Sequence, residues 1–301
     1  MRFGLLGTGP WAERAHGPGL QAHSRAEIAG VWGRRPEAAR ALADRFSTRA
    51  YDDVDALFAD CDAVAVALPP DVQAPLAERA AAAGCHLLLD KPVATEVAAA
   101  RQVVAAVERA GVASVVFFTL RFREETAGWL AERAGEEGWL LGRADWLSPV
   151  FAGADTPYAA SPWRGDKGAL WDVGPHALSM LLPVLGDVDP AAPGAVTAAR
   201  GPGDTVHLAL RHASGASSTC TLSHTVPPQA SGVTVQLHGT PGVQTAPERD
   251  DAGPVPAFVR AVDALLEAAE TGRPDPRDVR LGLRVTEILA AAEEGLPTAG
   301  A

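Results

Sequence analysis

The 301-residue sequence predicts an α/β fold, in which an N-terminal doubly wound parallel sheet precedes a second domain of the α+β type. Over the first 120 residues, short continuous apolar runs alternate with helical patterns, and a glycine-rich turn joins the first run to the first helix. Beyond residue 120, several β-type runs follow one another between longer helices. We therefore expect one domain at 1–120 and a second at 121–301.

Continuous apolar runs mark the strands of the first domain. The run Ala63–Leu68 is apolar throughout, as expected of a parallel strand that is covered on both faces. The expected strands are Arg2–Leu6, Glu27–Trp32, Ala63–Leu68, His86–Leu89 and Ser114–Thr119. The expected helices between them are Trp11–Gln21, Pro36–Phe46, Val72–Ala83 and Glu96–Ala110.

The second domain has a different order of elements. Its expected helices are Glu124–Ala134, Ala169–Leu185, Val255–Glu270 and Val279–Glu293. Its expected strands are Ala144–Val150, Ala195–Ala199, Thr205–His212, Ala216–Thr225 and Val233–His238. The turn residues Ala213–Gly215 predict a hairpin between two of these strands.

Composition excludes several classes of protein. The net charge of −11 argues against nonspecific nucleic-acid binding, which needs a basic surface. No apolar run reaches the roughly 18 residues of a membrane helix, and the N-terminus has no secretory signal pattern. Cys61, Cys85 and Cys220 have no C-x-x-C spacing, so we expect no disulfide framework and no metal site. This usage fits a reducing cytoplasm.

The segment Gly7-Thr8-Gly9-Pro10-Trp11-Ala12 fits the G-x-G-x-x-A form of the dinucleotide fingerprint of Rossmann domains. Gly7 permits the tight turn, Gly9 lets the backbone approach a pyrophosphate, and Ala12 lets the helix pack on the strand. The N-terminus of that helix offers amide groups to phosphates. We therefore expect residues 7–11 to bind a nucleotide cofactor; the alternative is a purely structural glycine turn.

The end of the second strand bears on the choice of cofactor. An NAD site usually has an acidic residue there, whereas this chain has Gly33, Arg34 and Arg35. A guanidinium can pair with the 2′-phosphate of NADP. We expect NADP(H) to be preferred and NAD(H) to be possible. Alternatively, both arginines are solvated residues at a helix start and the site accepts both cofactors.

Two further segments carry candidate catalytic groups. Asp90-Lys91-Pro92 ends a buried strand, at the sheet edge where ligands of open α/β folds bind. Asp172 and His176 are four residues apart, on one helix face, so the carboxylate can orient the imidazole. Pro175 predicts that this helix starts or kinks nearby. Alone, Lys91 could be a capping or salt-bridge lysine, and the Asp–His pair a structural hydrogen bond.

Together these segments resemble the glucose–fructose oxidoreductase/inositol dehydrogenase family, or Gfo/Idh/MocA. The resemblance follows the chain in order through Gly7–Gly9, Val64–Pro70, Asp90–Pro92, Trp163-Arg164 and Asp172–His176. It implies a Rossmann domain followed by a substrate-binding and oligomerisation domain built on a large, mostly antiparallel open sheet. The last helices of such proteins often return to the first domain, and the sheet face often forms a homodimer or homotetramer contact.

The resemblance also implies residue roles. It makes Lys91, Asp172 and His176 catalytic, with His176 as the acid/base. The remaining expected cofactor or active-site contacts are Leu68, Pro69, Pro70, Gln73, Asp90, Pro92, Arg121, Trp163 and Arg164. Three positions depart from the usual pattern: Asp90 replaces Glu, Gln73 stands where His is common, and Ser179 stands where Asp is common. These departures leave the substrate open.

The expected activity is reversible hydride transfer between nicotinamide and a secondary alcohol or ketone of a sugar, polyol or related molecule. Two alternatives remain: a non-catalytic NAD(P)-binding regulator, and a hydrolase or lyase that oxidises its substrate transiently. The other histidines are expected to be structural or on the surface: His16, His23, His207, His212, His224 and His238. Trp129, Trp139, Trp146 and Trp171 are expected in the core.

Overall fold

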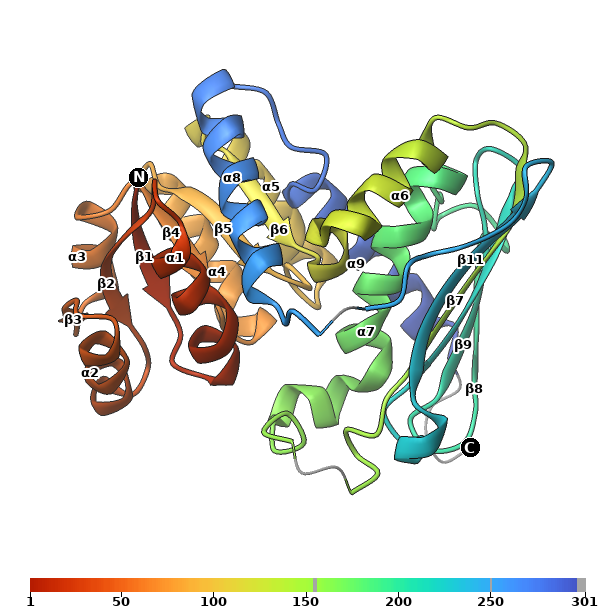
Figure 1. The fold of residues 1–301 in the computed structure, drawn as a ribbon, viewed down its shortest axis with the longest axis horizontal. Helices are drawn as coiled ribbons and strands as arrows, with labels where there is room; N and C mark the ends of the chain where they lie inside the picture. The colour runs from red at the N-terminus through yellow and green to blue at the C-terminus, as the bar shows by residue number, and fades with distance from the viewer. Residues whose placement is uncertain (154–155, 250, 297–301) are drawn as a thin grey trace. The chain divides into compact units, whose positions relative to one another are not determined.

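The computed structural model describes residues 1–153, 156–249 and 251–296, and the chain divides into two compact units (Figure 1). The first unit comprises Met1–Arg123 and Asp250–Leu283, and the second comprises Glu124–Arg249 and Arg284–Ala301. Helix α9 (Val279–Glu294) begins in the first unit and continues into the second. No helix within the described ranges is long and apolar enough to cross a membrane.

The first unit is built on a parallel sheet of six strands. They are β1 (Arg2–Leu6), β2 (Glu27–Trp32), β3 (Ala50–Tyr51), β4 (Ala63–Val66), β5 (His86–Asp90) and β6 (Ser114–Phe117). Their order is β3-β2-β1-β4-β5-β6, and every neighbouring pair is parallel. The predicted doubly wound fold is therefore confirmed. The strand order reverses between β1 and β4, which is where ligands of such sheets bind.

Most helices of this unit lie at the predicted places. They are α1 (Gly17–Ala22), α2 (Pro36–Arg45), α3 (Val54–Ala59), α4 (Pro70–Ala82), α5 (Val97–Ala110) and α8 (Val255–Thr271), with a 3-10 turn η2 at Thr119–Phe122. The helix expected at Trp11–Gln21 contains a wide π turn, η1 (Ala12–His16), before α1 begins. The short elements β3 and α3 were not predicted, because two and six residues are too few for a periodic pattern.

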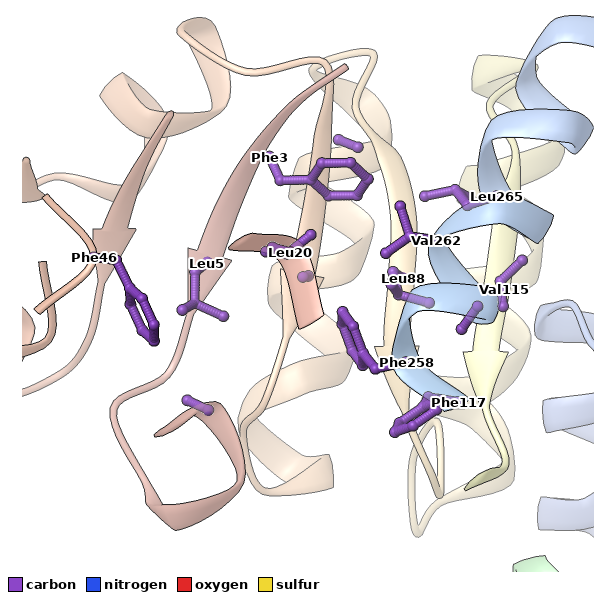
Figure 2. Packing of buried hydrophobic residues seen from close by; sticks show 14 of the residues in the cluster. Phe3, Leu5, Leu20, Phe46, Leu88, Val115, Phe117, Phe258, Val262 and Leu265 are labelled. Atoms are coloured by element: carbon purple, nitrogen blue, oxygen red, sulfur yellow. The ribbon is translucent and has the colours of Figure 1, made fainter. Parts of the chain in front are cut away.

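A single hydrophobic core joins β1, β5 and β6 to α1 and α8 (Figure 2). Phe258, Val262 and Leu265 on α8 are fully buried in it. A Cβ atom at Gly19 would lie 2.5 Å from the Phe258 ring, so only glycine lets α1 approach α8 this closely. Truncating a buried Phe typically costs about 3–5 kcal/mol, which makes Phe258 a major anchor of α8 on the sheet.

The second unit contains a six-stranded sheet in the order β12-β11-β7-β10-β9-β8. The strands are β7 (Trp139–Leu147), β8 (Val196–Arg200), β9 (Val206–Arg211), β10 (Ser217–Ser223), β11 (Gly232–Gly239) and β12 (Gly242–Thr245), with a 3-10 turn η3 at Pro228–Ala230. Only β7 and β10 pair in parallel, so the predicted mostly antiparallel sheet is confirmed. The predicted hairpin joins β9 to β10. Strand β7 starts five residues earlier than predicted, and β12 was not predicted.

Helices α6 (Glu124–Ala134) and α7 (Pro162–Leu185) belong to this unit, and α7 packs on β7 and β10. The helix start expected at Ala169 and its end at Leu185 are confirmed, whereas the start or kink expected near Pro175 was wrong. Pro175 lies inside the helix, and the kink is at Gly168, whose φ of 63° and ψ of −165° are not helical. Oδ2 of Asp204 accepts a hydrogen bond from the Ala169 amide (3.1 Å) and thereby caps the second part of α7.

Candidate functional site

The fingerprint turn has the geometry that a close-approaching phosphate requires. Gly7 has φ 115°, and a Cβ atom there would lie 2.3 Å from the Ala67 carbonyl oxygen. At Gly9 a Cβ would meet no atom within 4 Å, so the backbone faces open space. Ala12 is fully buried at the start of the helix. The first amides of a helix have no partner within it, and they face this turn.

The end of β2 lies beside the fingerprint. A Cβ at Gly33 would lie 2.6 Å from the Thr8 methyl group, so these two residues are neighbours. Arg34 and Arg35 follow, and both are exposed. Within the described ranges, neither guanidinium has a hydrogen-bonded or ion-paired partner. Two unpaired cations therefore stand next to the turn.

Gln73 on α4 holds the turn that follows β5. The residue is fully buried. Its Nε2 donates to the backbone oxygens of Asp90 (2.8 Å), Pro92 (3.0 Å) and Val93 (3.3 Å), and its Oε1 accepts from the Asp90 amide (2.9 Å). The Gln73 amide thus joins α4 to the turn after β5. The cofactor contact that the sequence predicts for Gln73 stays a prediction.

The turn itself carries Lys91. Oδ1 of Asp90 accepts a hydrogen bond from the Lys91 backbone amide at 2.8 Å. The Lys91–Pro92 peptide is cis, and Pro92 is buried. Lys91 is half-buried at the carboxyl end of β5. Asp90, Gln73 and Pro92 thus fix the backbone from which the lysine side chain extends.

Leu68, Pro69 and Pro70 link β4 to α4, with Pro69 as the N-cap and Pro70 as the first helical residue. Arg121 lies in η2, after β6. Burial, and then the nearby charge of Arg277, lower the pKa of Arg121 to about 10. Its backbone oxygen accepts from the Arg277 guanidinium at 3.3 Å.

In the second unit, Asp172 and His176 both lie on α7 and are 7% exposed. Oδ2 of Asp172 accepts hydrogen bonds from Nε of Arg164 (2.9 Å) and is 3.1 Å from Nε2 of His224. Arg164 therefore ties the segment before the Gly168 kink to the helix after it. The sequence predicts that the Asp172 carboxylate orients His176, and this stays a prediction; Oδ2 of Asp172 itself contacts Arg164 and His224.

The His176 ring stacks on an indole. It lies parallel to the Trp146 indole, with ring centroids 4.7 Å apart and an interplanar angle of 14°. Trp146 is half-buried, so the prediction that it belongs to the core was wrong; Trp129, Trp139 and Trp171 are buried as predicted. The hydroxyl of Ser179 donates to the His176 backbone oxygen at 2.8 Å, one turn away on α7.

Trp163 and Arg164 lie in the first turns of α7. The Arg164 guanidinium is 4.6 Å from the Trp163 ring centroid and 5.1 Å from that of Tyr158. Two aromatic faces thus support the cation that pairs with Asp172.

His224 and Ser148 were not predicted as site residues. Nδ1 of His224 is 2.6 Å from the Ser148 hydroxyl, which completes a chain from Ser148 through His224 to Asp172. The parallel register pairs Leu147 with Ser223, and this places Ser148 beside His224. No local sequence pattern predicts such a contact, because it arises from two strands that are far apart in the sequence.

The remaining histidines have structural or surface positions. His23 is 2.9 Å from an Asp263 oxygen, and His212 bridges the Gly186 oxygen and the Ser218 hydroxyl at 2.7 and 2.8 Å. His16 is fully buried beside the Phe258 ring, at a centroid distance of 4.4 Å. In the part of the chain that the structure describes, no three His, Cys, Asp or Glu residues are grouped so as to hold a metal.

Comparisons with known proteins agree with this geometry. Residues 1–118 match the family model described as GFO/IDH/MocA, an oxidoreductase family with an NAD-binding Rossmann fold. Residues 140–244 match the model of the C-terminal domain of the same family.

Two curated relatives illustrate the similarity. The dTDP-3,4-didehydro-2,6-dideoxy-α-D-glucose 3-reductase of Streptomyces violaceoruber is 33% identical over 190 residues, which cover 62% of this chain and 55% of the relative. The D-apiose dehydrogenase of Paraburkholderia graminis is 31% identical over 227 residues, which cover 73% of this chain and 60% of the relative. The chain thus spans less than two thirds of the length of either relative.

A solved structure, an oxidoreductase from Agrobacterium radiobacter in complex with NAD+, L-tartaric acid and magnesium, superposes with a TM-score of 0.81. The alignment covers 98% of this chain and 96% of that one, at 21% identity. At this identity the likeness establishes the shared fold.

Proposed function

Because this chain belongs to the Gfo/Idh/MocA oxidoreductase family, we propose that it is an NAD(P)-dependent dehydrogenase or reductase. Its substrate is a secondary alcohol or ketone of a sugar, polyol or related small molecule, a class supported by the sugar-acting names of its relatives. The observation that carries the proposal is the open backbone at Gly9, directly beside the strained turn at Gly7.

The residues present fit a dinucleotide. Gly7, Thr8, Gly9, Pro10 and Trp11 would hold the pyrophosphate against backbone amides. Gly33, Arg34 and Arg35 would hold the ribose end, and the two exposed cations favour NADP(H) over NAD(H). The turn of Leu68, Pro69 and Pro70 and the turn of Asp90 and Pro92 would line the same crevice. When bound, the nicotinamide supplies the hydride chemistry.

Side chains of the protein transfer the substrate's hydroxyl proton and stabilise the charge that develops on its oxygen. His176 accepts the substrate hydroxyl proton during oxidation and returns it during reduction. Stacking on Trp146 holds the imidazole plane in place for this transfer. Lys91 stabilises the oxygen on which negative charge develops. Asp172 keeps a fixed negative charge in the second unit, anchored by Arg164 and His224.

We also propose a cytoplasmic homodimer or homotetramer. Leu141 and Val243 are 52% and 60% exposed, and both pair in register with His238 of β11. They therefore place apolar surface on one face of the sheet, where a second copy would cover it. Sedimentation of the purified chain tests this, and a monomer at micromolar concentration would reject it.

The activity is tested by incubating the purified protein with NADP or NAD and a panel of sugars, sugar nucleotides and polyols. A dehydrogenase reduces one nicotinamide for each substrate oxidised. An enzyme that oxidises its substrate only transiently gives product without net reduction, and a regulator binds cofactor without chemistry. Either of the last two outcomes would reject the proposed activity.

A further inference from the structure

Two cysteines that are 24 residues apart in the sequence meet in the first unit. Cys61 lies two residues before β4 and Cys85 lies directly before β5, and the register of these strands pairs Ala63 with His86. The two Sγ atoms are consequently 3.9 Å apart. Sequence spacing gave no sign of this pair, because the contact depends on the pairing of two strands.

The two thiols differ in access. Cys85 is 1% exposed, and its Sγ lies 3.4 Å from the Phe58 carbonyl oxygen. Cys61 is partly exposed. The hydrogen bond from Cys85 lowers the pKa of the Cys61 thiol, whereas the same contact and burial raise the pKa of Cys85. Cys61 is thus the less buried residue of the pair, and its thiol is the one that loses its proton more readily.

The pair lies away from the turns described above. Both cysteines precede their strands, whereas Gly7 and Lys91 follow theirs. In a parallel sheet, the two ends of the strands form opposite edges. Chemistry at the cysteines is therefore separate from the fingerprint turn and from Lys91.

We propose that Cys61 and Cys85 form a dithiol that is oxidised reversibly by hydrogen peroxide. The Cys61 thiolate attacks one peroxide oxygen, the O–O bond breaks, and Cys61 becomes a sulfenic acid with release of hydroxide. The Cys85 sulfur then attacks the sulfenic sulfur and loses its proton, and the sulfenic oxygen leaves as water. Overall, two thiols and one peroxide give one disulfide and two waters.

The geometry leaves a short distance to close. Starting from 3.9 Å, the sulfurs must approach by roughly 1.9 Å to reach bonding distance. The third cysteine is an internal control, because Cys220 is 1% exposed and burial raises its pKa to about 12.

The test treats the purified full-length chain with a small molar excess of peroxide, followed by blocking of free thiols and non-reducing peptide mapping. We expect a Cys61–Cys85 linked peptide, an intact mass lower by two hydrogen atoms, full reversal by dithiothreitol, and free Cys220. In Cys85→Ser the sulfenic acid on Cys61 should persist and react with dimedone. In Cys61→Ser the remaining thiols should stay reduced.

Peptide mapping of the wild-type chain tests whether the Cys61–Cys85 disulfide forms, even if a variant fails to fold. A Cys61 that is oxidised only to sulfinic or sulfonic acid, with Cys85 still free, would overturn the proposal. So would labelling of Cys220 at the same rate as Cys61.

Discussion

Nε2 of His224 lies 3.1 Å from Oδ2 of Asp172, and the opposite ring nitrogen lies 2.6 Å from the hydroxyl of Ser148. The imidazole is 1% exposed, so this contact is made away from solvent. Together with Arg164, it gives the Asp172 carboxylate one fixed position.

Replacing His224 by Ala should therefore disturb Asp172 without removing a group proposed to touch substrate. We expect kcat to fall about 10- to 100-fold, since misplacement of a supporting group by about 1 Å can have an effect of this size. Cofactor affinity should change little. His207→Ala is the matched control, because His207 is an exposed histidine on β9. Equal kcat values for both variants would remove His224 from the account.

A second prediction concerns the side chain of Gln73. Gln73→Leu leaves the backbone oxygens of Asp90, Pro92 and Val93 without their donor. Each buried group left unsatisfied costs about 1–3 kcal/mol, so the melting temperature should fall clearly. Turnover should fall further than the loss of folded protein explains, because the backbone that carries Lys91 is released. Gln102→Leu, on the exposed side of α5, should leave both quantities unchanged.

We expect the two arginines after β2, Arg34 and Arg35, to determine which cofactor is preferred. In Arg34→Ala/Arg35→Ala, NADPH should bind about 10- to 100-fold more weakly, the loss expected for hydrogen bonds to a charged group, while NADH affinity stays similar. Isothermal titration with both cofactors measures this, with the exposed Arg109→Ala as control. A wild-type protein that binds NADH more tightly than NADPH would contradict the assignment.

His16 should make the first unit sensitive to acid. Burial lowers its pKa from 6.5 to about 3 in the folded chain. Below pH 6.5 the His16 imidazole therefore binds a proton in the unfolded chain but stays neutral in the folded chain. As a result, the free energy of unfolding decreases as the pH falls below 6.5. At pH 5 this amounts to roughly 2 kcal/mol. Denaturant unfolding at pH 7 and pH 5 should show a smaller pH effect for His16→Leu than for the wild type; an identical effect would exclude His16 as a cause.

Much of the fold could be predicted because its signals are local. Buried parallel strands are continuously apolar, as at Ala63–Val66, so the apolar run is visible in the sequence. The first turn needs glycine for steric reasons, so the glycine pattern also marks its position in the sequence. The positions of Arg34, Arg35 and Lys91 could also be predicted, because each follows the end of a strand that the sequence marks.

What could not be predicted depends on pairing between distant segments. The Ser148–His224 contact spans 76 residues and follows from the register of β7 and β10. The His224–Asp172 contact spans 52 residues and follows from the packing of α7 on β10. The kink of α7 was placed at Pro175 because proline disrupts helices in general. The structure accommodates that proline and breaks at Gly168, where Asp204 caps the next segment.

We propose above that this chain transfers hydride and that His176 moves the accompanying proton. The most direct measurement supplies an active substrate deuterated at the reacting carbon and follows deuterium into the nicotinamide by NMR, for the wild type and His176→Ala. We expect deuterium at the ring C4 for the wild type, and transfer slowed about 100-fold or more in the variant with nearly unchanged cofactor affinity. Transfer at the wild-type rate in His176→Ala, or product formed without deuterium in the nicotinamide pool, would contradict it.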